Sequence, residues 1–453
     1  MRHPHPTLVS LTALFALAAP RASARADVPE PSAAPEAAPL DLAAVRARAA
    51  GHSPRLAEGA AAAAAAAARA DAADARRWPK LALLARYTRL SHVDPGSLQL
   101  PLAQPNGEPL PAVAFGEAVE DQASVRLTVE QPLFTGFALT RGVEAAAQGQ
   151  ALVGATRAVD AADLRLRADE AYYALLRARR ALAVARDSLE RTVARSREVA
   201  ALVAAERATG LEVARMRAQE AGARAALARA EAAEGASRRV LALLIGASPD
   251  SALPIVDDLD AAAEPARGAG EGHLDAQVAE ARASLRATQA EAAEAGLWPQ
   301  LALRLGATWA NPNERYFPPQ AEWNATWDAS VVLSWQFDAL ATVHEAEAAR
   351  SDAAQARLAA EAVRERALIE ATRHEAARLG AAAAVAALGE AVQARHDALT
   401  QTEALYRAGR STLTEVLDRQ AEHDQARLDR VDAQVELRLA LSRGQRWHTA
   451  PAP

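Results

Sequence analysis

The chain has no cysteine among its 453 residues. This absence excludes disulfides and thiolate metal sites, and it leaves no N-terminal cysteine to carry a lipid anchor. Outside the first 26 residues there is no run of 18 apolar residues, so we expect no transmembrane helix. The sequence also lacks a GxGxxG or P-loop for nucleotides and an HExxH motif for zinc. We therefore expect no metal, no cofactor and no enzymatic activity.

The N-terminus is predicted to direct the chain out of the cytoplasm. Arg2 precedes the apolar run LVSLTALFALAA, and small residues follow as far as Ala26, so residues 1–26 have the pattern of a secretory signal peptide. Residues 27–39 are rich in Pro and Ala and are predicted to be a linker. The formal net charge is −6, with no basic stripe, so no nucleic-acid partner is expected.

Two stretches of the chain repeat one pattern. ALVAAERATGLEVARMRAQ begins at Ala201 and ALYRAGRSTLTEVLDRQAE begins at Ala404, and they align without a gap at a shift of 203 positions. WPKLAL at Trp78 and WPQLAL at Trp298 repeat as well. The sequence therefore predicts an internal duplication. Its parts are a first repeat (40–246), an equatorial connector (247–271), a second repeat (272–443) and a C-terminal tail (444–453).

The first copy contains a Pro-rich segment that the second copy lacks. The two Trp-Pro motifs are 220 positions apart, so the first copy holds 17 extra residues before Phe134. We place them in residues 93–121 and expect an exposed loop there, because surface loops tolerate insertions.

Apolar and polar residues alternate in two segments of each repeat. Val125, Leu127 and Val129 share one side of such a pattern, while Arg126 and Thr128 share the other. This period of two predicts β-strands at about 80–90, 122–133, 299–310 and 327–337. Each has roughly ten residues, the length of a tilted strand that crosses a bilayer.

Long segments without proline follow the strands. Residues 138–205 and 341–408 are predicted to be single helices of about 100 Å. Returning helices are expected at 210–246 and 412–443. Shorter helices are expected at 40–77 and 272–297, so that a short helix and a returning helix stacked end to end match one long helix.

Aromatic residues make up only 4% of the chain, yet they gather at the ends of the predicted strands. This distribution is typical of the interfacial belts of membrane barrels, although alternation alone also fits a soluble, half-buried sheet. Four strands cannot close a barrel, whereas three chains would supply twelve. The predicted membrane belt consists of Trp78, Phe134, Trp298, Trp309, Trp327, Trp335 and Phe337.

The order of these motifs resembles the TolC-like outer-membrane efflux proteins. A WPxLAL strand, a strand that ends in QPLFTG, a long helix and a YxxGxxTxxEVLD turn occur between about Leu40 and Leu441. The resemblance implies an α+β membrane protein, mainly α, in which three chains form a 12-stranded β-barrel continued by an α-helical periplasmic tunnel. It also implies a passive exit duct in the outer membrane of a Gram-negative bacterium. Such ducts serve tripartite efflux or type I secretion systems, and they dock to a periplasmic adaptor and an inner-membrane pump.

The resemblance further implies which residues lie at the periplasmic tip. Glu415 and Asp418 match the acids that line the closing constriction, and Leu211 and Glu212 occupy the pore-side positions of the first copy. The tip turn and adaptor contact would comprise Tyr406, Gly409, Arg410, Ser411, Thr412, Arg207, Thr209 and Gly210.

Two features of the tip leave alternatives open. Both Thr-x-x-Glu sequences, which begin at Thr209 and Thr412, are also capping boxes, so their glutamates could serve the helix ends instead of the pore. In the first copy Glu206 stands where the second copy has Gly409, and Gly210 is the candidate to take over the turn.

An alternative without a barrel is a periplasmic long-helical coiled-coil adaptor or scaffold, which would also be exported and rich in alanine. Such a protein would not require paired amphipathic strands at matched places in both repeats. The exported cargo stays open, because drug, metal-ion and protein exporters share the architecture that the resemblance implies.

Overall fold

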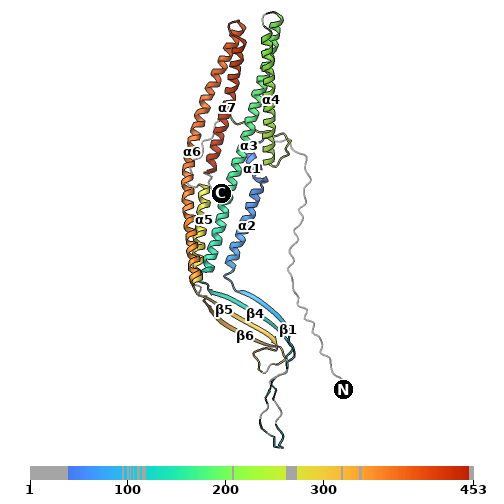
Figure 1. The fold of residues 1–453 in the computed structure, drawn as a ribbon, viewed down its shortest axis with the longest axis vertical. Helices are drawn as coiled ribbons and strands as arrows, with labels where there is room; N and C mark the ends of the chain where they lie inside the picture. The colour runs from blue at the N-terminus through green and yellow to red at the C-terminus, as the bar shows by residue number, and fades with distance from the viewer. Residues whose placement is uncertain are drawn as a thin grey trace, which may run out of the picture.

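The described chain forms a long helical rod that ends in a bent four-stranded sheet (Figure 1). The predicted signal peptide (1–26) and nearly all of the predicted linker (27–39) lie outside the described residues. The computed structural model describes residues 39–93, 96–98, 101–102, 104–105, 107–109, 113–114, 119–206, 209–261, 273–317, 320–335 and 339–447.

Four antiparallel strands form the sheet, in the order β1-β4-β5-β6. They are β1 (Lys80–Arg89), β4 (Asp121–Phe134), β5 (Gln300–Asn311) and β6 (Asn324–Ser334). The two repeats meet where β4 pairs with β5. β1 and β6 lie at the two edges, and in the described chain each pairs with a strand on one side only.

The last strand differs from the prediction of 327–337. β6 begins earlier, at Asn324, and ends earlier, at Ser334. The pairing explains the shift, because Ala310 lies opposite Asn324 and Gln300 lies opposite Ser334. The two ends of β5 therefore fix the two ends of β6, and the aromatic residues that follow are not part of the strand.

The pairing register separates an apolar face from a polar face. Leu83, Leu127, Ala307 and Trp327 form one row across the four strands. The alternate rows contain most of the Arg, Glu, Asp, Thr and Ser residues of the sheet. Residues directly opposite each other in neighbouring strands share a face. The register thus confirms the predicted alternation of period two.

The segment 93–121, predicted as an exposed loop, contains a short hairpin in its described part. β2 (Ser97–Leu98) pairs antiparallel with β3 (Val113–Ala114). The side chains of Leu98 and Leu102 are exposed. The alternation of the sequence did not reveal these strands, because each has only two residues.

Two long helices run from the sheet to the far end of the rod, in agreement with the predicted 138–205 and 341–408. They are α3 (Ala138–Ala204, 67 residues) and α6 (Ala339–Arg407, 69 residues). None of the described helices combines the length and the apolar character needed to cross a bilayer. Two helices return from the far end, α4 (Gly210–Leu244) and α7 (Leu413–Trp447). The shorter helices lie toward the sheet (Figure 1), and they are α1 (Leu42–His52), α2 (Pro54–Ala75), α5 (Leu274–Ala293) and the 3-10 helix η1 (Glu294–Leu297).

α7 extends beyond residue 443, the predicted end of the second repeat. Its final turn is anchored by Arg446, which donates to Asp163 of α3 (2.5 Å) and to Asp275 at the start of α5 (3.3 Å). Because these bonds hold the last turn against two other helices, the helix continues to Trp447 and includes part of the predicted tail (444–453).

A hydrophobic core lies halfway along the rod, where the connector packs on the helices. Tyr172 of α3 is fully buried together with Leu241 of α4 and Leu253 of the connector. The Tyr172 hydroxyl donates to the carbonyl of Val256 (2.5 Å). Leu40 pairs with the same stretch of connector through a parallel bridge. The connector therefore fastens the first repeat at its middle.

A glycine is required where the sheet joins α3. Gly136 has a φ of +61°, and a Cβ there would lie 2.6 Å from the carbonyl oxygen of Ala295 and 2.7 Å from the Cβ of Trp298. Ala295 and Trp298 belong to another helix–sheet junction, in the second repeat, where η1 leads into β5. The two helix–sheet junctions are thus packed directly against each other.

Gly136→Ala should destabilise the folded chain by about 2 kcal/mol or more, because it combines a left-handed alanine with a backbone clash. Gly142→Ala is the matched control, since Gly142 lies inside α3 with no atom within 4 Å of an added Cβ, and alanine favours helix there. Urea unfolding followed by tryptophan fluorescence measures both variants. A Gly136→Ala protein as stable as the wild type would contradict the described junction.

Candidate functional site

The rod ends in two helix hairpins, one from each repeat, which contain the tip residues predicted from the sequence. In the second hairpin α6 ends at Arg407, Gly409 has a φ of +71°, and α7 begins at Leu413. In the first, Glu206 has a φ of +56° at the position that corresponds to Gly409, and α4 begins at Gly210. The expectation that Gly210 takes over the turn is therefore wrong. Both hairpins keep the same left-handed position, which Glu206 occupies although it has a side chain.

A glutamate caps the helix that leaves each turn. The N–H of Thr412 donates to the Glu415 carboxylate (3.2 Å), and the N–H of Glu415 donates to the Thr412 hydroxyl (3.3 Å). The Ser411 hydroxyl also donates to this carboxylate, and that bond is the main cause of the lowered pKa of Glu415. In the first hairpin the N–H of Thr209 donates to Glu212 (3.1 Å). The capping role of both glutamates is thus present in the structure.

Asp418 differs from Glu415 in having no partner among the described residues. It lies three residues further along α7, on the same side of the helix. Its side chain is exposed and forms no hydrogen bond or ion pair with any described residue. In the first repeat the corresponding residue is Arg215, which donates to the Thr414 hydroxyl of α7 (3.1 Å). At these corresponding positions, Arg215 of the first hairpin makes a contact between the hairpins, whereas Asp418 of the second has a carboxylate that no described residue binds.

A small hydrophobic cluster joins the two hairpins beneath their turns. Val199, Met216 and Leu413 are its buried members, and Tyr406 packs against them. The predicted pore-side residue Leu211 is 60% exposed at the start of α4. Of the remaining predicted tip residues, Thr209, Gly210, Gly409, Arg410 and Thr412 are exposed, Ser411 is half-buried, and Arg207 lies outside the described residues.

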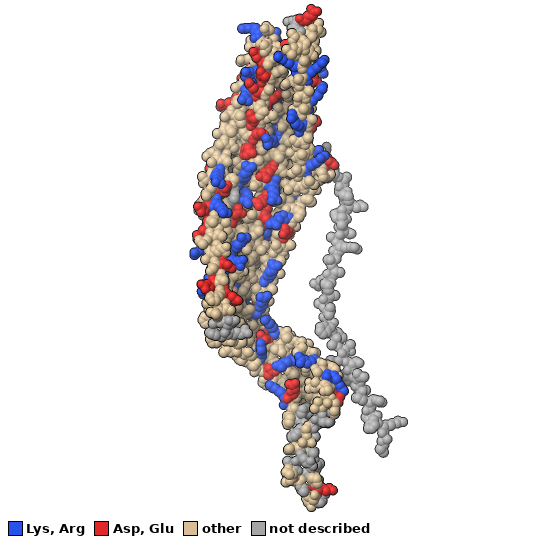
Figure 2. Space-filling view, in the orientation of Figure 1, with Lys and Arg blue, Asp and Glu red and all other residues tan. Residues whose placement is uncertain are grey.

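Ion pairs connect α3 to α7 along the half of the rod that carries the tip. Arg191 donates to Asp424 (2.6 Å), and Arg427 donates to Asp187. We call these four residues the α3–α7 seam. Charges of both signs are interspersed over the visible face of the helices (Figure 2). Sequence reasoning did not single out the seam, because charged residues recur along all these helices and each partner lies in another helix.

His423 of α7 is buried within this seam. The residue is 7% exposed, its Nδ1 has no hydrogen-bond partner among the described residues, and its ring lies 5.3 Å from that of His396 on α6. Burial lowers the pKa of His423 below its ordinary value of 6.5, and the charges of Arg427, Arg191 and His396 act in the same direction, while Asp424 opposes them. The burial and the neighbouring cations of the α3–α7 seam therefore favour the neutral imidazole of His423.

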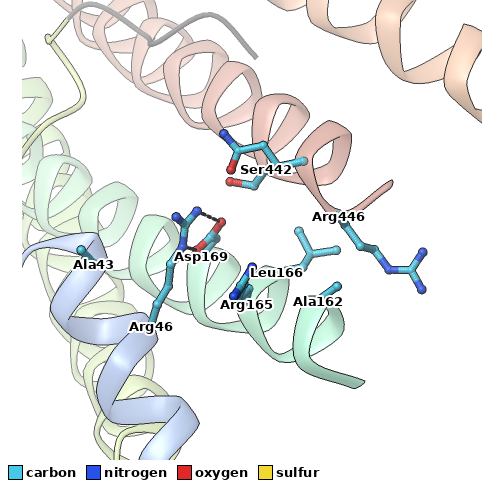
Figure 3. Close-up of a pocket in the computed structure, with 9 residues that line it drawn as sticks. Ala43, Arg46, Ala162, Arg165, Leu166, Asp169, Ser442 and Arg446 are labelled. Carbon is cyan, nitrogen blue, oxygen red and sulfur yellow. Dashed lines mark hydrogen bonds and ion pairs between the residues drawn. The ribbon is translucent and has the colours of Figure 1, made fainter. Parts of the chain in front are cut away.

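A cavity of about 280 Å³ lies near the middle of the rod between α1, α3 and α7 (Figure 3). There Arg46 donates to the buried Asp169 through two bonds of 2.7 and 2.6 Å. This pair is the first cause of the raised pKa of Arg46. Ser442 also lines the cavity, but the only carboxylate among the lining residues is committed to Arg46, so no nucleophile and base are paired. The cavity lies where three helices pack together, and its lining residues form no catalytic arrangement.

Apart from Trp327, which lies opposite Ala307 within the sheet, the described aromatic residues of the predicted membrane belt lie toward the two ends of the sheet. At the helix end, Phe137 makes edge-to-face contacts with Phe134 (5.5 Å) and Trp298 (6.4 Å). At the other end, the rings of Trp309 and Trp323 are 4.5 Å apart. Trp78, Trp327 and Trp335 are also exposed, and Phe337 lies outside the described residues. Within the described ranges no group of His, Asp and Glu side chains is arranged to hold a metal ion.

Comparison with known proteins gives one family match and several matches of fold. Residues 269–443 match the family model described as outer membrane efflux protein. No curated protein sequence matches the chain. The fold matches a structure of CusC with a TM-score of 0.74 and 16% identity, over 89% of this chain and 91% of that chain.

Two further structures match over a similar length. The outer membrane protein VceC from Vibrio cholerae has a TM-score of 0.71 and 19% identity, over 89% of this chain and 96% of that chain. The open state of the outer membrane channel MtrE from Neisseria gonorrhoeae has a TM-score of 0.70 and 19% identity, over 89% of each chain. These matches establish the predicted fold class, a mainly helical chain with four strands.

The stability of the α3–α7 seam should fall as the pH decreases. Because the pKa of His423 is lowered in the folded chain, its neutral form contributes stability that is complete above pH 6.5 and is lost as the pH falls through the lowered value. Amide exchange in α7 around residue 423, corrected for the intrinsic pH effect, should therefore accelerate as the pH falls below 6.5.

His423→Gln should reduce this acceleration, whereas His344→Gln should not, since His344 is exposed on α6 far from the seam. The same pH response in wild type and His423→Gln would show that another group controls the seam.

Proposed function

Because residues 269–443 match the family model described as outer membrane efflux protein and the fold matches outer membrane channels, we propose that this chain is the passive outer-membrane channel of a tripartite efflux or type I secretion system. The observation that carries this proposal is a sheet with one apolar face and two unpaired edges at the end of helices about 100 Å long. Such a sheet suits hydrocarbon on one side and water on the other once its edges are paired.

Three copies of the chain would close the sheet into a barrel of twelve strands, with β1 of one copy against β6 of the next. The helices support the same head-to-tail ring. α6 packs on α5 and α7, whereas it makes no extensive contact with α2 or α4 in the described chain. Leu358, Leu368 and Leu379 of α6 are each more than half exposed. In such a ring, α2 and α4 of the neighbouring copy would cover this exposed side of α6.

The barrel would also hold the protein in the outer membrane, since a chain without cysteine cannot carry a lipid on that residue. A periplasmic scaffold would share the long helices. It would leave unexplained why both repeats supply a pair of amphipathic strands that join into one sheet. The duct itself would perform no chemistry, and we assign it no catalytic residue.

The two tip hairpins would meet a periplasmic adaptor. Their turns expose Thr209, Leu211, Arg410 and Thr412 at the far end of the rod. An inner-membrane pump would supply the energy, because this chain contains no nucleotide-binding motif of its own.

Asp418 is the main candidate for the acid that lines the periplasmic aperture. Its carboxylate is exposed and uncommitted, whereas that of Glu415 is bonded within the helix cap. In a trimer the two positions would give two rings of negative charge, to which Leu211 and Glu212 of the first repeat are adjacent. Rings of carboxylates at a narrow opening favour cations.

Asp418→Asn should therefore weaken the preference for cations and the block by divalent ions, because it removes one ring of charge without a large change in volume. Planar-bilayer recordings measure both effects, and the amount of trimer should not change. Glu415→Gln is the comparison variant, since it removes the other ring of charge while glutamine retains the capping geometry. Unchanged selectivity together with a weakened trimer would identify Asp418 as a structural surface residue.

Leu127→Arg and Thr128→Arg compare the two faces of the sheet at neighbouring positions of β4. The first variant should lose assembled protein, because a charge near the middle of the bilayer costs about 2–4 kcal/mol. The second places its charge on the polar face and should be tolerated. The heat-modifiable trimer band from outer membranes measures both. Equal yields from the two variants would mean that the sheet does not lie in a membrane.

A further inference from the structure

The polar face of the sheet carries more positive than negative charge. Its charged residues occupy alternate positions of the four strands, and the register places all of them on the face opposite to the leucine and tryptophan rows. They are Lys80 and Arg86 on β1, Arg126 and Glu130 on β4, Arg304 on β5 and Asp328 on β6.

The two acids each have an arginine partner on this face. Arg304 lies directly opposite Glu130 and donates to it (2.9 Å). Arg126 donates to Asp328 (3.2 Å), which is two strands away. Gly306 of the intervening strand makes this reach possible, because a Cβ at that position would lie 2.6 Å from Asp328 Oδ1. Both acids on this face are therefore already paired with arginines.

The positive charges of Lys80 and Arg86 are not balanced by an acid among the described residues. Both side chains are exposed, and neither forms a hydrogen bond or an ion pair with a described residue. They are six positions apart on β1, which separates them by about 20 Å along the strand. Lys80 lies opposite Glu130, which already pairs with Arg304, and Arg86 lies opposite the uncharged Ser124.

We propose that Lys80 and Arg86 form an anion-attracting collar inside the barrel, which favours cargo with phosphate or carboxylate groups. This inference rests on the proposed function, because only a closed barrel turns the polar face into the wall of a water-filled lumen. Each copy would contribute both residues, so a trimer would hold two rings of positive charge at different depths.

The physical setting favours multivalent anions over small monovalent ones. A wall backed by hydrocarbon focuses the field of its charges into the lumen. At physiological ionic strength this field decays over about 8 Å, so it acts mainly on solutes that come close to the wall. An anion with several charges is attracted more strongly by each collar residue than a monovalent anion is. The collar would thus select at the exit for a charge opposite to the one that Asp418 favours at the tip.

The test compares block of single-channel current by inositol hexakisphosphate, added from the barrel side in about 0.1 M KCl. The wild type should be blocked from this side. In Lys80→Gln/Arg86→Gln the concentration for half block should rise about tenfold or more, because both positive rings are lost. Lys80→Arg/Arg86→Lys is the matched control, which keeps both charges and should keep the block.

Four outcomes separate this inference from the proposed function. Wild-type channels that the probe does not block, or a double glutamine variant blocked like the wild type, would overturn the collar while leaving the channel intact. Loss of block in the charge-retaining control would overturn it too. A wild-type chain that forms no channel would instead refute the proposed function. The single variants Lys80→Gln and Arg86→Gln should shift the block in the same direction, and they carry the test if the double variant does not assemble.

Discussion

The outer backbone edges of β1 and β6, which are unpaired in the described chain, are the constraint on which the rest of the structure depends. Each edge presents N–H and C=O groups that water can satisfy but hydrocarbon cannot, at a cost of several kcal/mol for each buried group without a partner. The chain cannot pair its own edges, because β4 and β5 separate them. Insertion of this sheet into a membrane would therefore require association with further copies, of which each would contribute one edge of each kind.

The helices extend the same arrangement away from the sheet. Gly136 packs against the η1–β5 junction of the second repeat, so the start of α3 has a fixed place relative to β5. Further along the rod, the contacts between α3 and α7 change in character. The middle is held mainly by a buried hydrophobic core. Toward the tip, only a small hydrophobic cluster remains, and the ion pairs of Arg191, Asp424, Asp187 and Arg427 surround the buried His423. A seam of ion pairs around an imidazole responds to pH and salt in a way that a hydrophobic core does not. The adjustable part of the chain thus lies beside the proposed aperture.

The distribution of charge supports a duct with distinct ends. The tip carries an uncommitted carboxylate at Asp418, and the polar face of the sheet carries uncommitted cations at Lys80 and Arg86. Elsewhere along the rod most charged residues are interspersed with opposite charges, which suits a solvated surface (Figure 2). Selectivity would then arise at two positions near the ends of the path rather than along its whole length.

Much of the fold could be predicted from the sequence, because the duplication allows each weak pattern to be checked against its copy. The strand pattern of β4 and the proline-free length of α3 have counterparts in β6 and α6, and the structure contains all four elements. The ends of β6 could not be predicted, since its partner strand determines them. The left-handed Glu206 was missed because glycine usually occupies such a position and Gly210 lies nearby.

The contacts between helices are the part that sequence reasoning could not reach. Arg191 could pair with any of many acids, and only the rotation of α3 against α7 brings it to Asp424. The sequence left two roles open for Glu415, and the structure bonds its carboxylate within the helix cap. The bond from Ser411 adds to the cap that the motif predicts. The free carboxylate of Asp418 became evident only by contrast with it.

Covalent linkage between the two sheet edges tests the central claim most directly. The chain has no cysteine, so Ala85→Cys on β1 and Ala329→Cys on β6 would be its only thiols. A flexible bismaleimide applied to outer membranes should convert the variant with both cysteines into linked dimers and trimers, and should leave each single variant monomeric in denaturing gels. A double variant that stays monomeric would contradict closure of the sheet by neighbouring copies, as would single variants that cross-link equally well.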